Sequence, residues 1–264
     1  MMQKRVNGVV LNYEVFGDSG PWVVLSHSLM CDLTMWGPQI DILKNDYRVL
    51  AFDTRGHGGS EATEGPYSFD ELALDSKALI DSLKIIRPHW IGLSMGGMIG
   101  MTYAVNFPGS FASLILCNTT SRMPPENLPA WQERVDSAKN GGIKGMVPGV
   151  LARWFTEPFL SQPRPEVEFV SNLIQQTSVT GYVGCCHAIS KINCTSRLNE
   201  INAPIEIIAG DSDMSTPVAM SLEMQAAAPG SNLSIIAGAS HLSNIEQPQQ
   251  FNASILAFLG QHST

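Results

Sequence analysis

Short apolar runs separated by helix-length segments constrain the fold of this chain more than any other feature. The runs lie at residues 22–26, 48–52, 89–93, 114–117, 205–209 and 233–237. Continuous apolar runs of this length are typical of strands buried on both faces, and helix-length spacers favour parallel pairing between them. The sequence therefore predicts an α/β fold, in which a mainly parallel sheet carries helices on both faces.

Local signals at both ends of the chain support this architecture. Asn7-Gly8 lies between two alternating runs, a pattern that predicts a tight β-hairpin turn. Helices are expected over residues 69–83 and 249–259, where apolar residues recur at helical spacing. A further helix, over residues 95–107, is expected directly after the run at residues 89–93.

The alternation of strands and helices is interrupted between residues 120 and 202. This stretch is rich in Pro and Gly, contains Trp131 and Trp154, and has helical rather than strand patterning. We interpret it as a helical cap, inserted between two strands of a core that residues 1–119 and 203–264 form together. Insertions at one end of a rigid sheet commonly carry binding specificity.

Composition and charge argue against several classes of function. The formal net charge is −8 and no basic run occurs, whereas a nucleic-acid partner would need clustered Lys and Arg. No stretch approaches the ~20 apolar residues that cross a bilayer, and the N-terminal residues do not read as a signal peptide. We therefore expect a cytoplasmic protein with no membrane partner. The five cysteines include no CxxC pair, which predicts reduced thiols and no metal site.

The segment Gly92-Leu93-Ser94-Met95-Gly96 matches the pattern G-x-S-x-G. It follows a predicted strand and opens a predicted helix, as in a nucleophile elbow, where the turn is so sharp that glycine is needed on both sides. Such a turn projects the serine hydroxyl above the sheet and leaves the next backbone N–H free for an oxyanion. The sequence thus predicts an α/β-hydrolase fold with Ser94 as the nucleophile.

A serine hydroxyl is a poor nucleophile unless a base takes its proton. His241 is the histidine that fits the Ser…Asp…His chain order of this fold, because it follows the last predicted strand and precedes the last predicted helix. His57 comes before Ser94 and fits that order poorly, so a buried, hydrogen-bonded role is expected for it. We therefore choose His241 as the base.

The loop after residue 209 offers two candidates for the acid that orients His241. Asp213 is preferred over Asp211, because the extra residues after the strand let the loop reach toward the imidazole. Asp211 remains the alternative, with capping of a helix or a loop as its other role.

Two backbone N–H groups are expected to hold the oxyanion. One belongs to Met95, directly after the nucleophile. The other should come from the loop after residues 22–26, where Leu29 is the expected donor.

The chain resembles the 3-oxoadipate enol-lactonases in segments that run nearly end to end: LSHSLMCDLTMW, AFDTRGHGGS, GLSMGG, LARWFTEPF and GASHLSNIEQP. The most distinctive are RWF at residues 153–155 and SNIE at residues 243–246. The resemblance implies a cytoplasmic α/β-hydrolase that opens an enol-lactone without metal or organic cofactor. It also implies Ser94, Asp213 and His241 as the catalytic triad.

A substrate of that family carries a free carboxylate, so its pocket should offer a cation. Arg134 is our candidate, because the fork of a guanidinium matches a carboxylate at two points. A surface arginine on an amphipathic helix is the alternative. Trp131 and Trp154 either wall the pocket or pack the insertion.

The expected reaction is hydrolysis of a small-molecule ester or lactone through an acyl-enzyme. A general carboxylesterase or a carbon–carbon bond hydrolase on the same fold is an open alternative, because fold does not determine substrate. A ligand receptor that retains the fold without turnover is a more distant one. GLSMGG is not G-x-G-x-x-G, which argues against dinucleotide binding. The oligomeric state is left open.

Overall fold

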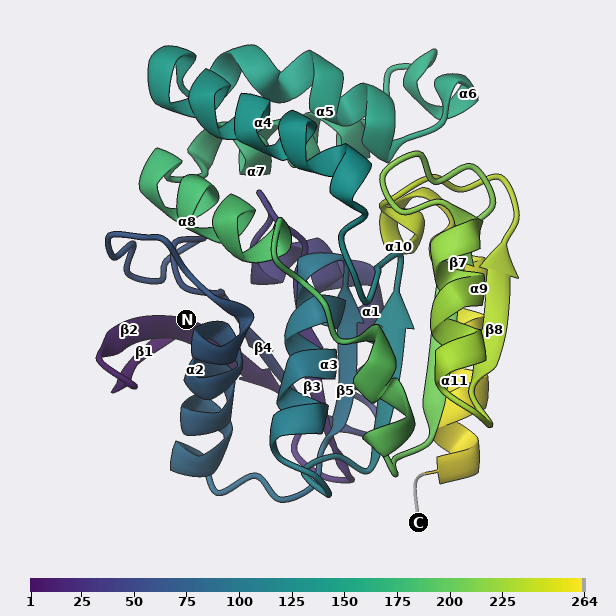
Figure 1. Cartoon of the computed structure of the whole chain (residues 1–264). Coiled ribbons are helices and arrows are strands. Elements are labelled where there is room, and N and C mark those ends of the chain that lie inside the picture. The colour runs from purple at the N-terminus through teal and green to yellow at the C-terminus, as the bar shows by residue number, and fades with distance from the viewer. Residues whose placement is uncertain (263–264) are drawn as a thin grey trace.

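A computed structural model describes residues 1–262 and contains one sheet of eight strands (Figure 1). The strand order is β1-β2-β4-β3-β5-β6-β7-β8. The pairs β1–β2 and β2–β4 are antiparallel, and all other neighbours are parallel. The strands are β1 Met2–Val6, β2 Val9–Phe16, β3 Trp22–Ser26, β4 Arg48–Phe52, β5 His89–Leu93, β6 Ser113–Cys117, β7 Ile205–Gly210 and β8 Asn232–Ile236.

The predicted parallel strands are confirmed, and β3, β4 and β5 have the predicted bounds. The expectation of full burial is wrong for β8, where Ile235 is 51% exposed. The reason is its place at the edge of the sheet, where β7 is its one neighbour among the described strands. An edge strand keeps apolar residues on the face that helices cover and exposes part of the other.

Helices cover both faces of the sheet, as the sequence predicts. Helices α2, α3 and α9 pack on one face, whereas α1 and α11 pack together on the other (Figure 1). No helix within residues 1–262 has the length and apolar character that crossing a membrane requires. The helices are α1 Gly37–Leu43, α2 Phe69–Ser82, α3 Met95–Asn106, α4 Leu128–Gly141, α5 Val147–Trp154, α6 Glu157–Leu160, α7 Pro165–Gln176, α8 Val179–Ile189, α9 Val218–Ala227, α10 Ser243–Glu246 and α11 Pro248–His262.

The N-terminal hairpin forms at the predicted turn. Asn7 and Gly8 connect β1 to β2, with Val6 opposite Val9, and have φ values of 45° and 79°. Positive φ at both central residues is the geometry that matches the twist of the flanking strands, and Asn-Gly adopts it at low cost.

The helical insertion lies between β6 and β7 in the chain. Its helices, α4 to α8, which we call the cap helices, lie over the edge at which the parallel strands end (Figure 1, teal to green). The sheet thus presents the loops that follow its strands to the inner side of the cap helices.

Candidate active site

The predicted nucleophile and base lie at the edge of the sheet beneath the cap helices. Ser94 follows β5 and His241 comes after β8, and both line one cavity of about 170 Å³. Residues of α4, α5 and α8 line the same cavity from the cap side. Ligands of open α/β sheets bind outside the carboxyl ends of the strands, and this cavity has that position.

Ser94 has the strained backbone of a sharp turn between strand and helix. Its φ and ψ are 54° and −113°, a region that a residue with a side chain rarely adopts. A Cβ on Gly92 would lie 2.3 Å from the Gly96 carbonyl oxygen, and one on Gly96 would lie 2.0 Å from the Ser26 carbonyl oxygen. Glycine is therefore required on both sides of the serine. The Thr119 hydroxyl donates to the Ser94 carbonyl oxygen at 2.7 Å and holds the turn in place.

His241 and Asp213 form a buried pair. Nδ1 of His241 lies 2.9 Å from Oδ2 of Asp213, and neither side chain is more than 3% exposed. Burial by itself would raise the pKa of Asp213. The positive charge and hydrogen bond of His241, with the backbone N–H of Thr216, outweigh burial and hold that pKa below its usual value.

Two residues that we did not predict complete the surroundings of Asp213. Thr216 donates through its hydroxyl to Oδ2 at 2.7 Å, and Asn118 donates to the same oxygen at 3.0 Å. Asn118 directly follows β6, so its place at the same edge of the sheet was a signal available in the sequence. Thr216 lies on the Asp213 loop, where it is one of several short polar residues that only the folded loop distinguishes.

Asp211, the alternative acid, has a different set of partners. Its Oδ2 accepts from the Gly238 N–H at 3.0 Å, and its Oδ1 accepts from the Ala239 N–H at 3.3 Å. The carboxylate therefore caps the turn after β8, the other role considered for it. These backbone hydrogen bonds hold the pKa of Asp211 below its usual value although partial burial acts in the opposite direction.

His57 is buried beside His27, with ring centroids 5.4 Å apart. Burial, and then the proximity of His27, lowers the pKa of His57 to about 3, so the ring is neutral at pH 7. Its one contact to a protein acceptor within residues 1–262 is a 3.4 Å approach of Nδ1 to the Arg55 carbonyl oxygen. The expected buried role is observed, with weaker hydrogen bonding than we predicted.

The N–H groups of Leu29 and Met95 are the predicted oxyanion donors, and neither donates a hydrogen bond within residues 1–262. Leu29 lines the cavity. The Ser28 carbonyl oxygen accepts from His27 Nδ1 at 2.7 Å and from the Cys31 N–H at 3.2 Å. Because C=O and N–H point in opposite directions across a trans peptide, these two bonds direct the Leu29 N–H away from them.

Arg134, Trp131 and Trp154 all line the cavity. The Arg134 guanidinium lies over the Trp131 ring, 4.4 Å from its centroid. The Trp154 ring lies 6.1 Å from that of His241, at an angle of 35°. Arg134 is half-buried and has no ion-pair partner within residues 1–262. It therefore faces the cavity as an available cation.

A second arginine lies close to the first. Arg153 of α5 is half-buried, and burial followed by the charge of Arg134 lowers the pKa of Arg153. Two guanidinium groups that repel one another on the cap side give the cavity a positive bias, which favours an anionic ligand.

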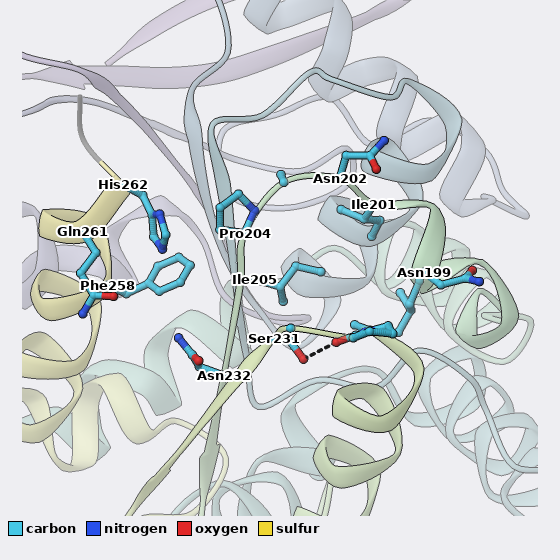
Figure 2. A pocket seen from close by; sticks show the side chains of 15 residues that line it. Asn199, Ile201, Asn202, Pro204, Ile205, Ser231, Asn232, Phe258, Gln261 and His262 are labelled. Carbon is cyan, nitrogen blue, oxygen red and sulfur yellow. Dashed lines mark hydrogen bonds between the residues drawn. The ribbon is translucent and has the colours of Figure 1, made fainter.

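A larger groove lies at the opposite edge of the sheet. Its volume is about 590 Å³, and it is bounded by Pro204 and Ile205 at the start of β7 and by Asn232 at the start of β8 (Figure 2). The amides of Asn199 and Gln261 lie on its two sides. None of the predicted site residues is among the described residues that line it.

The cysteines do not contribute a reactive thiol to the cavity. All five are free and buried. Burial raises their pKa values, that of Cys186 to about 12, so the thiols are protonated and unreactive at pH 7. Within residues 1–262 no group of three or more His, Cys, Asp or Glu side chains is arranged to hold a metal ion.

Comparison with known proteins places the chain in a family. Residues 21–248 match the model of the alpha/beta hydrolase fold. The chain is 36% identical over 252 residues to 3-oxoadipate enol-lactonase 2 of Acinetobacter baylyi, which covers 95% of this chain and 93% of that protein. It is 32% identical to 3-oxoadipate enol-lactonase 1 of the same organism, over 92% of this chain and 91% of that one.

A solved structure agrees with these relatives. The crystal structure of the enol-lactonase from Burkholderia xenovorans superposes with a TM-score of 0.94 at 35% sequence identity, over 98% of this chain and 100% of that one. The family model, the relatives and the solved structure all match along nearly the whole length, cap helices included. The chain therefore belongs to the 3-oxoadipate enol-lactonase family of α/β-hydrolases.

Proposed function

We propose that this protein hydrolyses a carboxylate-bearing enol-lactone, of the 3-oxoadipate enol-lactone type, through an acyl-enzyme. The observation that carries the proposal is a single cavity lined by Ser94, His241 and Arg134. That cavity combines a predicted nucleophile, a predicted base and a cation that has no ion-pair partner among the described residues, in a chain 36% identical to a 3-oxoadipate enol-lactonase.

In the proposed acylation step, His241 takes the proton of Ser94. A carboxylate accepts hydrogen bonds only, so the contact with Asp213 keeps the proton of the imidazole on Nδ1 and leaves the lone pair of Nε2 for the serine hydroxyl. Ser94 Oγ then attacks the lactone carbonyl, and the N–H groups of Leu29 and Met95 hold the oxyanion. In comparable enzymes, removing one such donor lowers kcat by about 10²- to 10³-fold.

Collapse of the tetrahedral intermediate breaks the ring C–O bond. His241, now an imidazolium, gives its proton to the departing enolate oxygen, and the enol relaxes to a ketone. The leaving group stays tethered in the acyl-enzyme, so water has to attack before the ring closes again. His241 activates that water in the same way as it activates the serine.

Arg134 is proposed to bind the substrate carboxylate. Trp131 supports its guanidinium from one face, which leaves the donor fork free to point at a carboxylate in the cavity. Trp131 and Trp154 then form apolar walls around the ring. Arg153 adds to the positive potential without lining the cavity itself.

We also propose that residues 120–202 act as a cap domain that carries specificity, on a core of residues 1–119 and 203–264. The cytoplasm is the proposed compartment, and it suits a chain whose five cysteines are all free and buried.

The substrate is tested by comparing kcat/KM for 3-oxoadipate enol-lactone with that for small neutral esters. We expect a strong preference for the lactone in the wild type. Arg134→Ala should raise KM for the lactone about 10- to 100-fold, the size of a lost charge-assisted hydrogen bond, and leave neutral esters nearly unchanged. Arg134→Lys should recover part of the loss, because it keeps the charge without the fork.

A general esterase would behave differently. Equal kcat/KM values for lactone and neutral esters, together with an Arg134→Ala variant that acts like the wild type, would remove the lactonase assignment. Labelling by a fluorophosphonate probe checks the chemistry separately, since the wild type should react and Ser94→Ala should not.

A further inference from the structure

The two most distinctive segments of the sequence both lie next to the proposed base. RWF, residues 153–155, ends helix α5 of the cap, and SNIE, Ser243–Glu246, is helix α10 of the core. The mechanism above uses neither Arg153 nor Glu246 directly. Both segments hydrogen-bond to the loop that carries His241.

Ser240, the residue before His241, is held at each of its polar groups. Its N–H donates to Glu246 Oε2 at 2.7 Å, and its hydroxyl donates to the Arg153 carbonyl oxygen at 3.0 Å. Its carbonyl oxygen accepts from Asn118 Nδ2 at 3.2 Å. The backbone that leads into His241 is therefore fixed by α10, by the end of α5 and by the loop after β6.

The residue after His241 is tied to the cap as well. The N–H of Leu242 donates to the Trp154 carbonyl oxygen at 3.2 Å. The imidazole thus lies between two anchors, the Ser240 hydroxyl on one side and the Leu242 N–H on the other, and both donate to carbonyl oxygens in the last turn of α5. A displacement of α5 would break both anchors at once.

Glu246 connects these anchors to the next part of the cap. Its Oε1 accepts from the Thr156 N–H at 2.9 Å and from the Thr156 hydroxyl at 2.5 Å. The side chain is buried, and within residues 1–262 it has no ion-pair partner. The hydrogen bonds from Thr156 on the cap and from Ser240 on the His241 loop replace the hydration that its carboxylate loses on burial. A buried carboxylate depends on such bonds, so the three donors and the acceptor hold each other in place.

We propose that Glu246 is a positioning residue that makes the placement of His241 depend on the docking of cap helix α5. This inference rests on the proposed function, in which His241 is the base. With the cap docked, Glu246 joins Thr156 to Ser240, and His241 lines the same cavity as Ser94. With the cap displaced, the loop loses its bonds to Arg153 and Trp154, and Glu246 loses Thr156, so proton transfer is confined to the closed cavity.

Glu246→Gln is the decisive variant, because it keeps the shape of the side chain and replaces one of its two hydrogen-bond-accepting oxygens with a donor. A carboxylate accepts on both oxygens, whereas an amide accepts on one side and presents N–H donors on the other. In either orientation the amide nitrogen faces a donor, the N–H of Ser240 or the donors of Thr156. We expect kcat to fall about 10- to 100-fold, the scale of a misplacement near 1 Å, with KM changed much less.

Two comparisons separate positioning from packing. Thr156→Val removes one donor from the cap side and keeps the backbone bond, so a loss of only a few-fold in kcat is expected, and the double variant should lose no more than Glu246→Gln alone. Glu157→Gln removes a carboxylate from an exposed neighbouring position on the cap and should leave kcat unchanged. Near-ultraviolet circular dichroism and Tm identify any variant that fails to fold, and Thr156→Val then carries the test.

The rate of fluorophosphonate labelling at Ser94 distinguishes this inference from the proposed function. Labelling needs an active nucleophile but no particular substrate. A slower reaction in Glu246→Gln than in the wild type is the expected result. Equal labelling rates and equal kcat in the folded variant would overturn the inference and leave the hydrolase intact, whereas a wild type that never labels at Ser94 would overturn both.

Discussion

The two edges of the sheet each carry a hollow, and the smaller hollow has the predicted nucleophile and base. The cavity under the cap helices, about 170 Å³, is lined by Ser94 and His241, whereas the groove at the opposite edge, about 590 Å³, is lined mainly by amides and apolar side chains (Figure 2). Its one titratable side chain among the described lining residues is that of His262. The larger of these two hollows is therefore not the one that holds the predicted site residues.

The direction of the strands explains the difference. Residues that line the cavity follow the carboxyl ends of β3, β5, β6, β7 and β8, so segments distant in the chain converge there. The groove lies where β7 and β8 begin, next to the short connections that lead into them. In an α/β sheet the loops after the strands are free to vary and to carry polar side chains, and the scaffold holds them in place.

The largest expected effect comes from the nucleophile. Ser94→Ala should lower kcat by at least about 10⁴-fold, because no other group at the cavity supplies a comparable attack on the carbonyl. Steady-state assays on the lactone and on an activated ester measure the loss. Comparable turnover in this variant would show that the reactive group lies elsewhere in the molecule.

The two aspartates of one loop provide a matched pair. Asp213→Asn should lower kcat about 10³- to 10⁴-fold, because an amide opposite Nδ1 favours the wrong tautomer of His241. Asp211→Asn should affect kcat little and mainly lower Tm, since that carboxylate caps the turn at Gly238. A larger catalytic loss for Asp211→Asn than for Asp213→Asn would reverse our assignment.

Acid should destabilise both edges through buried histidines. The pKa of His57, in the loop after β4, is lowered to about 3, and that of His89, at the start of β5, to about 4; burial is the main cause in both. Unfolded histidines take up protons below pH 6.5, whereas the folded ones stay neutral, so stability is lost as pH falls from about 6.5 toward 4.

Inside that window, each histidine adds up to about 1.4 kcal/mol per pH unit to the slope of the unfolding free energy against pH. Urea unfolding of His57→Phe and of His89→Gln at pH 4 to 6 should each show a smaller dependence of the unfolding free energy on pH, by up to that amount near pH 5. An unchanged slope in either variant would mean that its histidine titrates normally in the folded state.

The smallest effect is expected at the groove. Asn202→Ala and Gln261→Ala remove amides from its two sides and should change kcat/KM for the lactone by less than about two-fold, as surface substitutions distant from a site usually do. A larger change in either variant would connect the groove to the reaction and weaken the contrast between the edges.

Much of the site was predictable because its signals are local. The G-x-S-x-G turn places Ser94, and the strand before it and the helix after it are readable from a few neighbouring residues. His241 follows from its position after the last strand. The observed bounds of β3, β4 and β5 agree with the predicted ones for the same reason, because a short apolar run predicts a buried strand from its own residues. The exposure of β8 was not readable, because an edge strand and a central strand differ in their neighbours and not in their own residues.

What the sequence by itself determined is the order of strands and helices, the elbow at Ser94 and the end of the sheet at which the loops gather. Only the tertiary structure decided that Asp213 contacts His241 while Asp211 caps a turn, that Arg134 faces the cavity, and that Glu246 joins Thr156 to Ser240. The physical reason is distance along the chain: a turn or a strand depends on adjacent residues, whereas these contacts join segments tens of residues apart, whose side chains acquire partners only when the sheet and the cap are assembled.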